Sequence, residues 1–489
     1  MIKFNLAKKG IDESRYDLLF VGKYRDRKSV TNRNMLNKKM IGVIDQAIEF
    51  DNFDSEIGSL LPINTHNFKK IKKVIILGMG NKNEINITAL CRIATTASGH
   101  LKKYKKCRTL FLLDIMSETD YLRSFMESVN LGLYEFKKYK GDPVEERRLS
   151  VDIYNSKISI KDFRDLIHNS FTVSSAINFA RDLVNEPPMF LTPTKLSEYA
   201  LKISRVSNLN CRIFDGKEIE KMGMGGLNAV SKGSEEPAKF IHIRYKPRNS
   251  KKNIAIVGKG ITYDTGGLSL KPSDSMRTMK MDMAGAACVL AVMSAISVIK
   301  PNIEVNCLVP TTENMPGGKA YKPDDVVNAY NGKSIEIINT DAEGRVCLAD
   351  ALSYAVKLKA DEIIDLATLT GACIVGLGPY TAGLITNNQH LGDRILDSAN
   401  KSAEKIWQLP LDDELKNEIK SDVADIKNAG SRWGGAISAA LFLENFVGDT
   451  PWAHLDIAGP AFIEKGGTWY PKGGTGFGVR TIINYITNS

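Results

Sequence analysis

Short apolar runs and helically spaced apolar residues alternate along the first third of the chain. The runs typical of buried strands lie at 2–6, 17–21, 74–77 and 110–113, and the stretches with helical spacing lie at 35–48, 87–101 and 121–132. Residues 137–160 are polar, and we expect them to be irregular, with a turn at Gly141-Asp142-Pro143 and an exposed charged step from Glu145 to Arg148. This order predicts a small α/β domain with a mainly parallel sheet over residues 1–165.

A helical pattern from 161 to 185 follows and connects this domain to a larger one. It ends at Asn185-Glu186-Pro187-Pro188, because a residue that precedes proline is disfavoured in the helical region. Beyond it, strand-like runs lie at 210–214, 240–245, 253–257, 304–309, 334–338 and 362–366, and helical patterns at 194–206, 284–299 and 346–358. The alternation predicts a doubly wound α/β domain over residues 166–489, in which ligands bind beyond the carboxyl ends of the strands.

Two carboxylates stand where the strand-like run at 334–338 passes into the next helical pattern. The connecting segment is NTDAEGR, residues 339–345, in which Asp341 and Glu343 are followed by Gly344, which lets the backbone turn, and by Arg345. Carboxylates crowded on a buried loop repel one another unless a cation lies between them. On its own, such a segment would more simply be an N-terminal helix cap with a surface Glu–Arg pair.

A second acidic cluster, within residues 257–287, changes this interpretation. Its chemically distinctive residues are Lys259, Asp264, Gly266, Gly267, Lys271 and Asp282. The four carboxylates of the two segments offer up to eight oxygens, which is enough for two divalent ions. Lysine is a poor ligand while protonated, but a metal ion in a buried loop can hold its amine neutral. The sequence therefore predicts a metal site built from both segments.

The composition is that of an ordinary globular protein, with 489 residues of which 43% are hydrophobic and 25% charged. No apolar run approaches the roughly 20 residues that cross a bilayer. The N-terminus, MIKFNLAKKG, lacks the apolar core and cleavage site of a secretory signal. We therefore expect a cytoplasmic protein without a membrane segment. The seven cysteines lack CxxC spacing, and we expect them to be reduced and mostly buried, with Cys347 packing in the helix after the acidic loop.

The excess positive charge of the chain lies entirely in its first third. Residues 1–170 contain 31 Lys and Arg against 21 Asp and Glu, a net charge of +10, whereas the remainder contains 35 of each. The densest basic runs are 69–73 and 102–108. A solvated surface accounts for these runs, and we favour that interpretation over nucleic-acid binding.

In its motifs, the second half of the chain resembles the leucyl aminopeptidase family, the two-metal cytosolic aminopeptidases that include bacterial aminopeptidase A. The motifs around the acidic clusters are KGITYDTGG, SLKP, MKMDMAGAA and NTDAEGR, and those elsewhere are NFARDLVNEPP, IDLATLTGA, IKSDVADIKNAG, WAHLDIAGPAF and GGTGFGVR. The resemblance is specific from about residue 178 to residue 480 and weak before that. No position that would carry metal or catalysis departs from the family pattern.

The resemblance implies a metal-dependent aminopeptidase that removes the N-terminal residue, preferably leucine or another apolar residue, from peptides. Two divalent ions, Mn2+ or Zn2+, would be held, one by Lys259, Asp264, Asp282 and Glu343 and the other by Asp264, Asp341 and Glu343. Lys271 would donate to the substrate carbonyl oxygen as negative charge develops there. Arg345 would hold a bicarbonate that acts as general base towards the attacking water. The apolar pocket for the first side chain would comprise Met279, Thr368, Leu369, Gly371, Ala458 and Ala461.

The resemblance also implies a homohexamer of two trimers with the second domains inward. The charge distribution favours the same arrangement, because the domain with a net charge of +10 is costly to bring close to its copies.

Two alternatives belong to other functional classes. Some bacterial relatives in this family also bind DNA. In this alternative the basic first domain would bind nucleic acid, and the enzyme core would serve as a scaffold or supply a second activity. Another two-metal hydrolase, such as a phosphatase, fits less well, because such enzymes typically draw on histidines and the six histidines here are dispersed. We expect His454 to pack or hydrogen-bond in the core.

Overall fold

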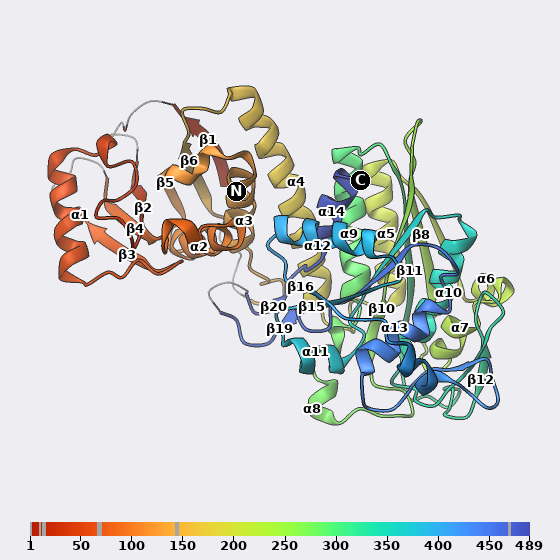
Figure 1. Cartoon of the computed structure of the whole chain (residues 1–489). Coiled ribbons are helices and arrows are strands. Elements are labelled where there is room, and N and C mark those ends of the chain that lie inside the picture. Colours follow the sequence, from red (N-terminus) through yellow and green to blue (C-terminus); the bar gives the residue numbers. More distant parts are fainter. Residues whose placement is uncertain (1, 9–10, 12–15, 66–70, 142–145, 468–470) are drawn as a thin grey trace. The chain divides into compact units, whose positions relative to one another are not determined.

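The computed structural model describes residues 2–8, 11, 16–65, 71–141, 146–467 and 471–489. The chain divides into two units, one of residues up to Ser175 and one of residues from Ala176 on, apart from a short segment after Gly466 that belongs to the first unit (Figure 1). Helix α4 (Ile160–Asn185) contains the boundary and matches the connecting helix expected over 161–185. The sequence placed the boundary between the domains earlier in the same helix, after residue 165.

The first unit is built on a six-stranded sheet in the order β1-β6-β5-β2-β4-β3. Its strands are β1 (Ile2–Ala7), β2 (Leu18–Lys23), β3 (Leu60–Asn64), β4 (Lys73–Gly78), β5 (Lys106–Leu112) and β6 (Arg148–Tyr154). Strand β3 runs antiparallel to β4, and the other neighbouring strands are parallel. The expected mainly parallel α/β sheet is therefore confirmed.

Helices cover both faces of this sheet. They are α1 (Lys38–Phe50), α2 (Ile87–Leu101) and α3 (Thr119–Gly132). Successive residues of a strand point to opposite faces, so Leu18 and Phe20 pack with residues of α2 and α3, whereas Leu19 and Val21 pack with residues of α1. One strand thus contributes to two separate cores.

The expectation that residues 137–160 are irregular is wrong for β6. This strand pairs in parallel with both β1 and β5, and it buries Leu149, Val151 and Ile153. The polar residues between its apolar ones prevented its recognition as a strand in the sequence. One of them, Asp152, is also buried, and its carboxylate accepts hydrogen bonds from Tyr16 and Arg108. The turn expected at 141–143, the charged step from 145 and the basic run at 69–73 lie partly outside the described residues.

The second unit contains a larger sheet in the order β16-β15-β18-β14-β9-β11-β8-β7, with β10 pairing beside β11. Its strands are β7 (Asn210–Phe214), β8 (Lys239–Tyr245), β9 (Asn253–Gly258), β10 (Gly260–Asp264), β11 (Glu304–Asn314), β14 (Glu362–Ala367), β15 (Ala382–Thr386), β16 (Ile406–Gln408) and β18 (Trp452–Asp456). Strands β11, β9, β14 and β18 form a parallel centre. Their carboxyl ends therefore meet at one edge, where ligands bind in such sheets.

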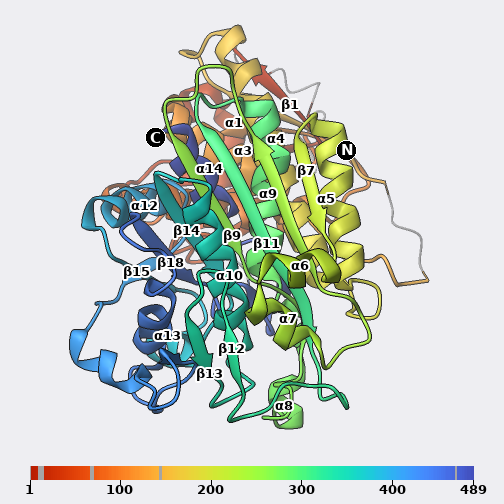
Figure 2. The ribbon, with the colours of Figure 1, turned by 90° about the vertical axis from the view of Figure 1, so that its right-hand side faces the viewer.

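Helices lie on both faces of this sheet as well (Figure 2). They include α5 (Pro193–Ser207), α6 (Gly216–Met222), α7 (Gly225–Ser231), α9 (Ala284–Ile299), α10 (Glu343–Lys357), α12 (Gln389–Lys401), α13 (Gly435–Glu444) and α14 (Val479–Thr487). Ala255 and Val257 of β9 belong to the core that contains the buried residues of α10, whereas Gly258 lies directly against Gly285 of α9. The expected α/β architecture with two domains is confirmed.

The strand expected over 334–338 is shorter than predicted and does not join the large sheet. It is β13 (Ser334–Glu336), which pairs with β12 (Val326–Asn328) and β17 (Ile426–Lys427) in a separate small sheet. The following helix α10 begins at Glu343, so this carboxylate opens the helix instead of lying on the preceding loop.

One segment corrects the statement that no apolar run approaches the length of a membrane span. Residues 273–299, which contain α9, are long and apolar enough to cross a membrane, with a mean hydropathy of 2.0 in their most apolar window. However, 78% of that window is buried inside the protein. Its apolar character is accounted for by packing between the sheet and helices α5 and α14.

Candidate metal centre

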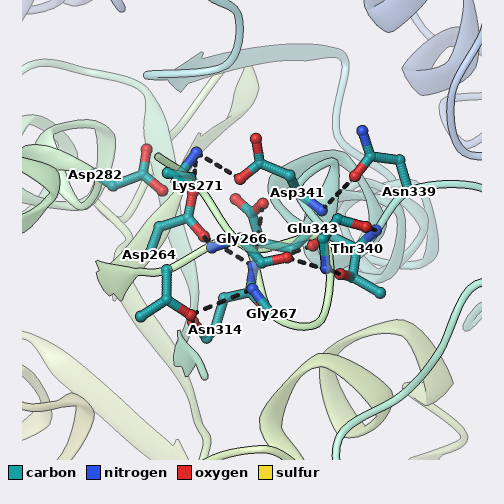
Figure 3. Close-up of polar contacts among 12 residues, drawn as sticks. Asp264, Gly266, Gly267, Lys271, Asp282, Asn314, Asn339, Thr340, Asp341 and Glu343 are labelled. Atoms are coloured by element: carbon teal, nitrogen blue, oxygen red, sulfur yellow. Dashed lines mark hydrogen bonds and ion pairs between the residues drawn. The ribbon is translucent and has the colours of Figure 1, made fainter. Parts of the chain in front are cut away.

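The five predicted metal residues lie in or directly beside four different elements and come together at one site. Lys259 directly follows β9, and Asp264 is the last residue of β10. Asp282 lies just before α9, Asp341 lies in the loop before α10, and Glu343 opens that helix. Segments about 80 residues apart in the sequence thus meet at one site (Figure 3).

Asp264, Asp341 and Glu343 form its most compact group, with one carboxylate oxygen from each within 4.8 Å of the others. The carboxylate of Asp264 is fixed, because its Oδ1 accepts hydrogen bonds from the Gly266 amide and from Nδ2 of Asn314, each at 2.8 Å. The ammonium of Lys271 lies 2.8 Å from Oδ2 of Asp264 and 2.5 Å from Oδ1 of Asp341. Lys271 therefore links the two segments across the mouth of the site.

Lys259 forms a similar pair of ionic contacts deeper in the site, between two other carboxylates. Its ammonium lies 2.8 Å from Oδ1 of Asp282 and 2.9 Å from Oε1 of Glu343, and it donates to the Thr368 carbonyl oxygen at 3.0 Å. Gly344 makes room for it, because a Cβ at that position would lie 2.5 Å from Cε of Lys259. The lysine is thus closely packed as well as paired.

Burial and mutual repulsion shift the ionisation of these groups. Burial raises the pKa of Asp282 and of Glu343, and the charge of Asp264 raises both further. Burial alone would lower the pKa of Lys259, but the charges of Asp282, Glu343 and Asp264 raise it above its ordinary value. Four carboxylates face only two ammonium groups, and uncompensated negative charge is costly in a buried site. The cluster therefore favours additional positive charge.

The donor set fits divalent metal ions. Oδ2 of Asp282 is buried and has no hydrogen-bond partner among the described residues, although its Oδ1 is bound by Lys259 and Thr368. Clustered carboxylate oxygens are the ligands that Mn2+ and other hard divalent ions prefer, and carboxylates also bind Zn2+. The residues that would hold such ions are Lys259, Asp264, Asp282, Asp341 and Glu343.

Sequence reasoning missed two asparagines that shape the site. Asn314, at the end of β11, donates from Nδ2 to Asp264 Oδ1 and, at 3.0 Å, to the Thr340 carbonyl oxygen. Asn428 donates to the Asn339 carbonyl oxygen at 2.8 Å and accepts from the Ile338 amide at 2.8 Å. Both tie the acidic loop to other parts of the unit. Asn428 lies within the IKSDVADIKNAG motif, and that is the signal that could have marked it.

Arg345 lies buried beneath the loop and forms none of the ion pairs found among the described residues. Its Nη1 donates to the Asn428 carbonyl oxygen at 3.0 Å, and its Nε has no hydrogen-bond partner in the described part of the chain. Burial lowers the pKa of Arg345 to about 10 despite the nearby charge of Glu343. A buried guanidinium with an unused donor suits a small anion.

A cavity of about 440 Å³ opens beside the carboxylates. Of the residues predicted for the first side chain, those that line it are Met279, Thr368, Leu369, Gly371 and Ala458. Ala461 is not among the lining residues but is buried, and its backbone bonds with Ile457 and Thr475. Ile374 and Ala372 of α11 (Gly371–Leu377) also line the cavity and add apolar surface.

Two further expectations are confirmed by the structure. His454 is fully buried, and its Nδ1 lies 2.6 Å from Oδ1 of Asp365, so it belongs to the core and not to the metal centre. None of the seven cysteines, all of which lie in the described residues, forms a disulfide; Cys211 is partly exposed and the others are buried. Cys347 packs in the first turns of α10, and burial raises its pKa well above the ordinary value.

Known proteins are similar to this chain in sequence and in architecture. Residues 178–483 match the model of the catalytic domain of the cytosol aminopeptidase family, and residues 20–143 match the model of its N-terminal domain. The chain is 45% identical over 456 residues to a probable cytosol aminopeptidase of Aquifex aeolicus, with 92% of each chain covered. It is 44% identical over 475 residues to one of Persephonella marina, with 95% of each covered.

Two solved structures are similar over nearly the whole chain. A mutant of tomato leucine aminopeptidase is 30% identical with a TM-score of 0.91, and the match covers 100% of this chain and 97% of that one. The bottromycin maturation enzyme BotP in complex with Mn is 30% identical with a TM-score of 0.85, and the match covers 97% and 99%.

These matches favour one of the classes of function raised by the sequence. They give no support to a phosphatase or to DNA binding, and both of these bacterial relatives are described as probable aminopeptidases. The chain belongs to the cytosol aminopeptidase family, the leucyl aminopeptidase family that its motifs resemble, and is a metal-dependent aminopeptidase.

Proposed function

We propose that the enzyme removes N-terminal leucine and other apolar residues from peptides with the help of two divalent ions. The observation that carries the proposal is the buried group of four carboxylates and two lysines beside a cavity with apolar walls. Family names that include the word cytosol also support a site of action in the cytoplasm.

The roles of the ligands follow from where their oxygens lie. Asp264 and Glu343 are central, since each lies near a lysine and near other carboxylates, and we assign them as ligands shared by both ions. Lys259 and Asp282 would complete one site, and Asp341 the other. When bound, the ions supply Lewis acidity and a nucleophilic water at neutral pH.

Lys271 would act on the substrate. It is the more exposed of the two lysines, with 15% of its side chain accessible against 4% for Lys259. From the edge of the carboxylates, its ammonium can donate to the carbonyl oxygen of the scissile peptide as negative charge develops there. Arg345 would hold a bicarbonate, whose oxygens accept the proton of the attacking water; its buried unpaired Nε supports an anion there.

The preference for apolar first residues rests on the cavity wall. Met279, Leu369, Ile374 and Ala458 give it apolar surface, and Gly371 leaves space for a side chain. Ala461 is buried and does not line the cavity, and its carbonyl oxygen accepts a hydrogen bond from the Thr475 amide. We assign the metal as Mn2+ or Zn2+, and the similarity to BotP, whose structure is a complex with Mn, supports the first.

The test is release of N-terminal residues from peptides by the purified enzyme. We expect leucine to be freed from leucinamide and from leucyl peptides, and the activity to disappear with a strong chelator and return with Mn2+ or Zn2+. An N-acetylated leucyl peptide should not be cleaved, because the acidic cluster with its ions would receive the free α-amino group. Cleavage of acetylated and free peptides at equal rates would contradict the proposal.

A further inference from the structure

An arginine at the rim of the cavity is not used by the proposed chemistry. Arg432 lines the same cavity as Lys271 and Arg345, and it lies in the loop that leads from β17 to α13. Unlike Arg345, it is exposed to solvent. Its side chain can therefore meet a part of the substrate that extends away from the carboxylates.

The loop around Arg432 is held in place on both sides. The Ser431 amide donates to Oε2 of Glu418 at 2.8 Å, and the Trp433 amide donates to Oγ of Ser431 at 3.3 Å. Gly434 then adopts a φ of +58°, a conformation that side chains rarely allow, and α13 begins directly after it. Arg432 thus projects from an anchored turn.

The guanidinium of Arg432 is positioned by stacking instead of by a charge partner. Its Cζ lies 4.2 Å from the centroid of the Trp433 ring, and neither a salt bridge nor a side-chain hydrogen bond joins it to another described residue. Stacking on an indole face leaves the N–H groups at the edge of the guanidinium free to bond in its plane. That edge matches a carboxylate, which it can bind through two parallel hydrogen bonds.

The charges in the cavity favour the same ligand. Two divalent ions would offset the four carboxylates of the metal centre and would bind Lys259 as a neutral amine, which leaves Lys271, Arg345 and Arg432 as cations on the cavity wall. Lys271 is paired and Arg345 is buried. Arg432 is therefore the cation that an extended substrate can reach at the rim.

We propose that Arg432 recognises a carboxylate on the departing part of the peptide, which makes the enzyme prefer short peptides with a free C-terminus. The proposal rests on the aminopeptidase function proposed above and assigns a specificity-determining residue to it. Two sources supply this group, the C-terminal carboxylate of a di- or tripeptide and the side chain of an acidic residue near the scissile bond.

The experiment compares kcat/KM for matched substrates in the metal-loaded enzyme and in the variants Arg432→Gln and Arg432→Lys. For wild type, we expect Leu-Gly and Leu-Gly-Gly to be hydrolysed about five- to tenfold more efficiently than their C-terminal amides, the scale of an accessible charge-assisted contact. Arg432→Gln should abolish this ratio, and Arg432→Lys should retain part of it. Leucinamide, which carries no carboxylate, is the control and should be hydrolysed equally by all three.

A second comparison identifies the source of the carboxylate. If the side chain supplies it, Arg432→Gln will reduce the preference for Leu-Glu-amide over Leu-Gln-amide and leave the ratio between free acids and amides unchanged. Equal ratios in wild type and Arg432→Gln for both comparisons, with leucinamide still hydrolysed, would overturn the proposal while leaving the aminopeptidase function intact. Failure of wild type to hydrolyse leucinamide would instead overturn the proposed function, and this proposal with it.

Trp433→Leu provides an independent check on the stacking. It keeps the charge of Arg432 but removes the ring that orients it. We expect the ratio between free acids and amides to fall to a value between those of wild type and Arg432→Gln. A ratio unchanged from wild type would show that orientation by Trp433 plays no part.

Discussion

The two lysines of the metal centre have different surroundings, although both form ion pairs with the same group of carboxylates. Lys259 is enclosed by Asp282, Glu343 and the Thr368 carbonyl oxygen, whereas Lys271 bridges Asp264 and Asp341 at the cavity. The motifs in the sequence were sufficient to pick out these residues. They did not reveal Asn314, which lies outside the motifs, or the role of Asn428, which lies within one, because the contacts of both asparagines with the acidic loop form only when distant segments are brought together.

Replacing Lys271 should separate metal binding from turnover. We expect the Lys271→Ala enzyme to retain its metal. Its kcat should fall by about 10²–10³-fold, because the variant loses only the hydrogen bond to the negative charge that develops on the reacting oxygen. Glu343→Ala should lose metal as well as activity, because its carboxylate is shared in the proposed site. Metal analysis beside initial rates checks both. Full occupancy in Glu343→Ala, or loss of metal in Lys271→Ala, would reverse these assignments.

Gly344 offers a test that changes no ligand. Alanine normally stabilises a helix by about 1 kcal/mol relative to glycine, but here the added Cβ would lie 2.5 Å from Cε and 2.7 Å from Nζ of Lys259. We expect Gly344→Ala to displace that lysine, so that metal affinity and activity fall while the protein remains folded, as measured by metal titration and circular dichroism.

Gly285→Ala is the contrasting variant. Its Cβ would meet the Leu366 carbonyl oxygen at 2.0 Å, and that backbone cannot move aside as a side chain can. We expect Gly285→Ala to reduce the yield of folded protein.

For Gly344→Ala, a metal affinity equal to that of wild type would show that the close packing around Lys259 is not required for metal binding.

The elements around the site are held together by pairing that local sequence patterns do not show. The segments α2, α9 and β7 were predicted with the bounds that the structure has, because α2 and β7 have regularly spaced apolar residues and α9 is an almost continuous apolar run. The strand before the acidic loop was misplaced, since a short apolar run such as 334–338 fits a small sheet as well as a large one. The position of β10 beside β11, which places Asp264, also depends on pairing across many residues.

Glu362 at the start of β14 joins this strand to two helices. Its carboxylate binds Arg394 of α12 at 2.9 and 3.1 Å, Lys252 at 2.7 Å and the hydroxyl of Tyr485 of α14. Burial opposes ionisation, but these partners outweigh it and hold the pKa of Glu362 below its ordinary value of 4.5. The ionised carboxyl therefore stabilises the folded state above pH 4.5, and this contribution is lost as the pH falls through the lower folded value.

We expect Glu362→Gln to lower the free energy of unfolding by about 2 kcal/mol at pH 7, as for loss of hydrogen bonds to a charged group. The difference from wild type should be constant between pH 6 and 8 and should shrink below about pH 4.5. Urea denaturation at a series of pH values measures it. As a control, Asp397→Asn, which alters an exposed ion pair with Lys401 on α12, should have little effect on the free energy of unfolding. A difference in this free energy between wild type and Glu362→Gln that grew towards acid pH would contradict the account.

The charge of the whole molecule bears on its assembly. The first 170 residues carry a net charge of +10, whereas the remaining residues have a net charge of zero. Contact between the second units of different chains therefore costs less electrostatic repulsion than contact between the first units. We propose a homohexamer of two trimers with the second units inward. Light scattering should give the mass of six chains at micromolar concentration, and charge reversal within 102–108 should leave that mass unchanged. A monomer would contradict the proposal, and so would a hexamer that dissociates on such reversal.

The number of metal ions bound per chain tests the central claim most directly. Enzyme freed of metal with a chelator should be titrated with Mn2+ or Zn2+ while bound metal and leucinamide hydrolysis are measured on the same samples. The four carboxylates and Lys259 predict that full activity is reached at two ions per chain, and that it does not survive the removal of both. Full activity at one ion per chain, or in enzyme without metal, would contradict the proposed two-metal centre.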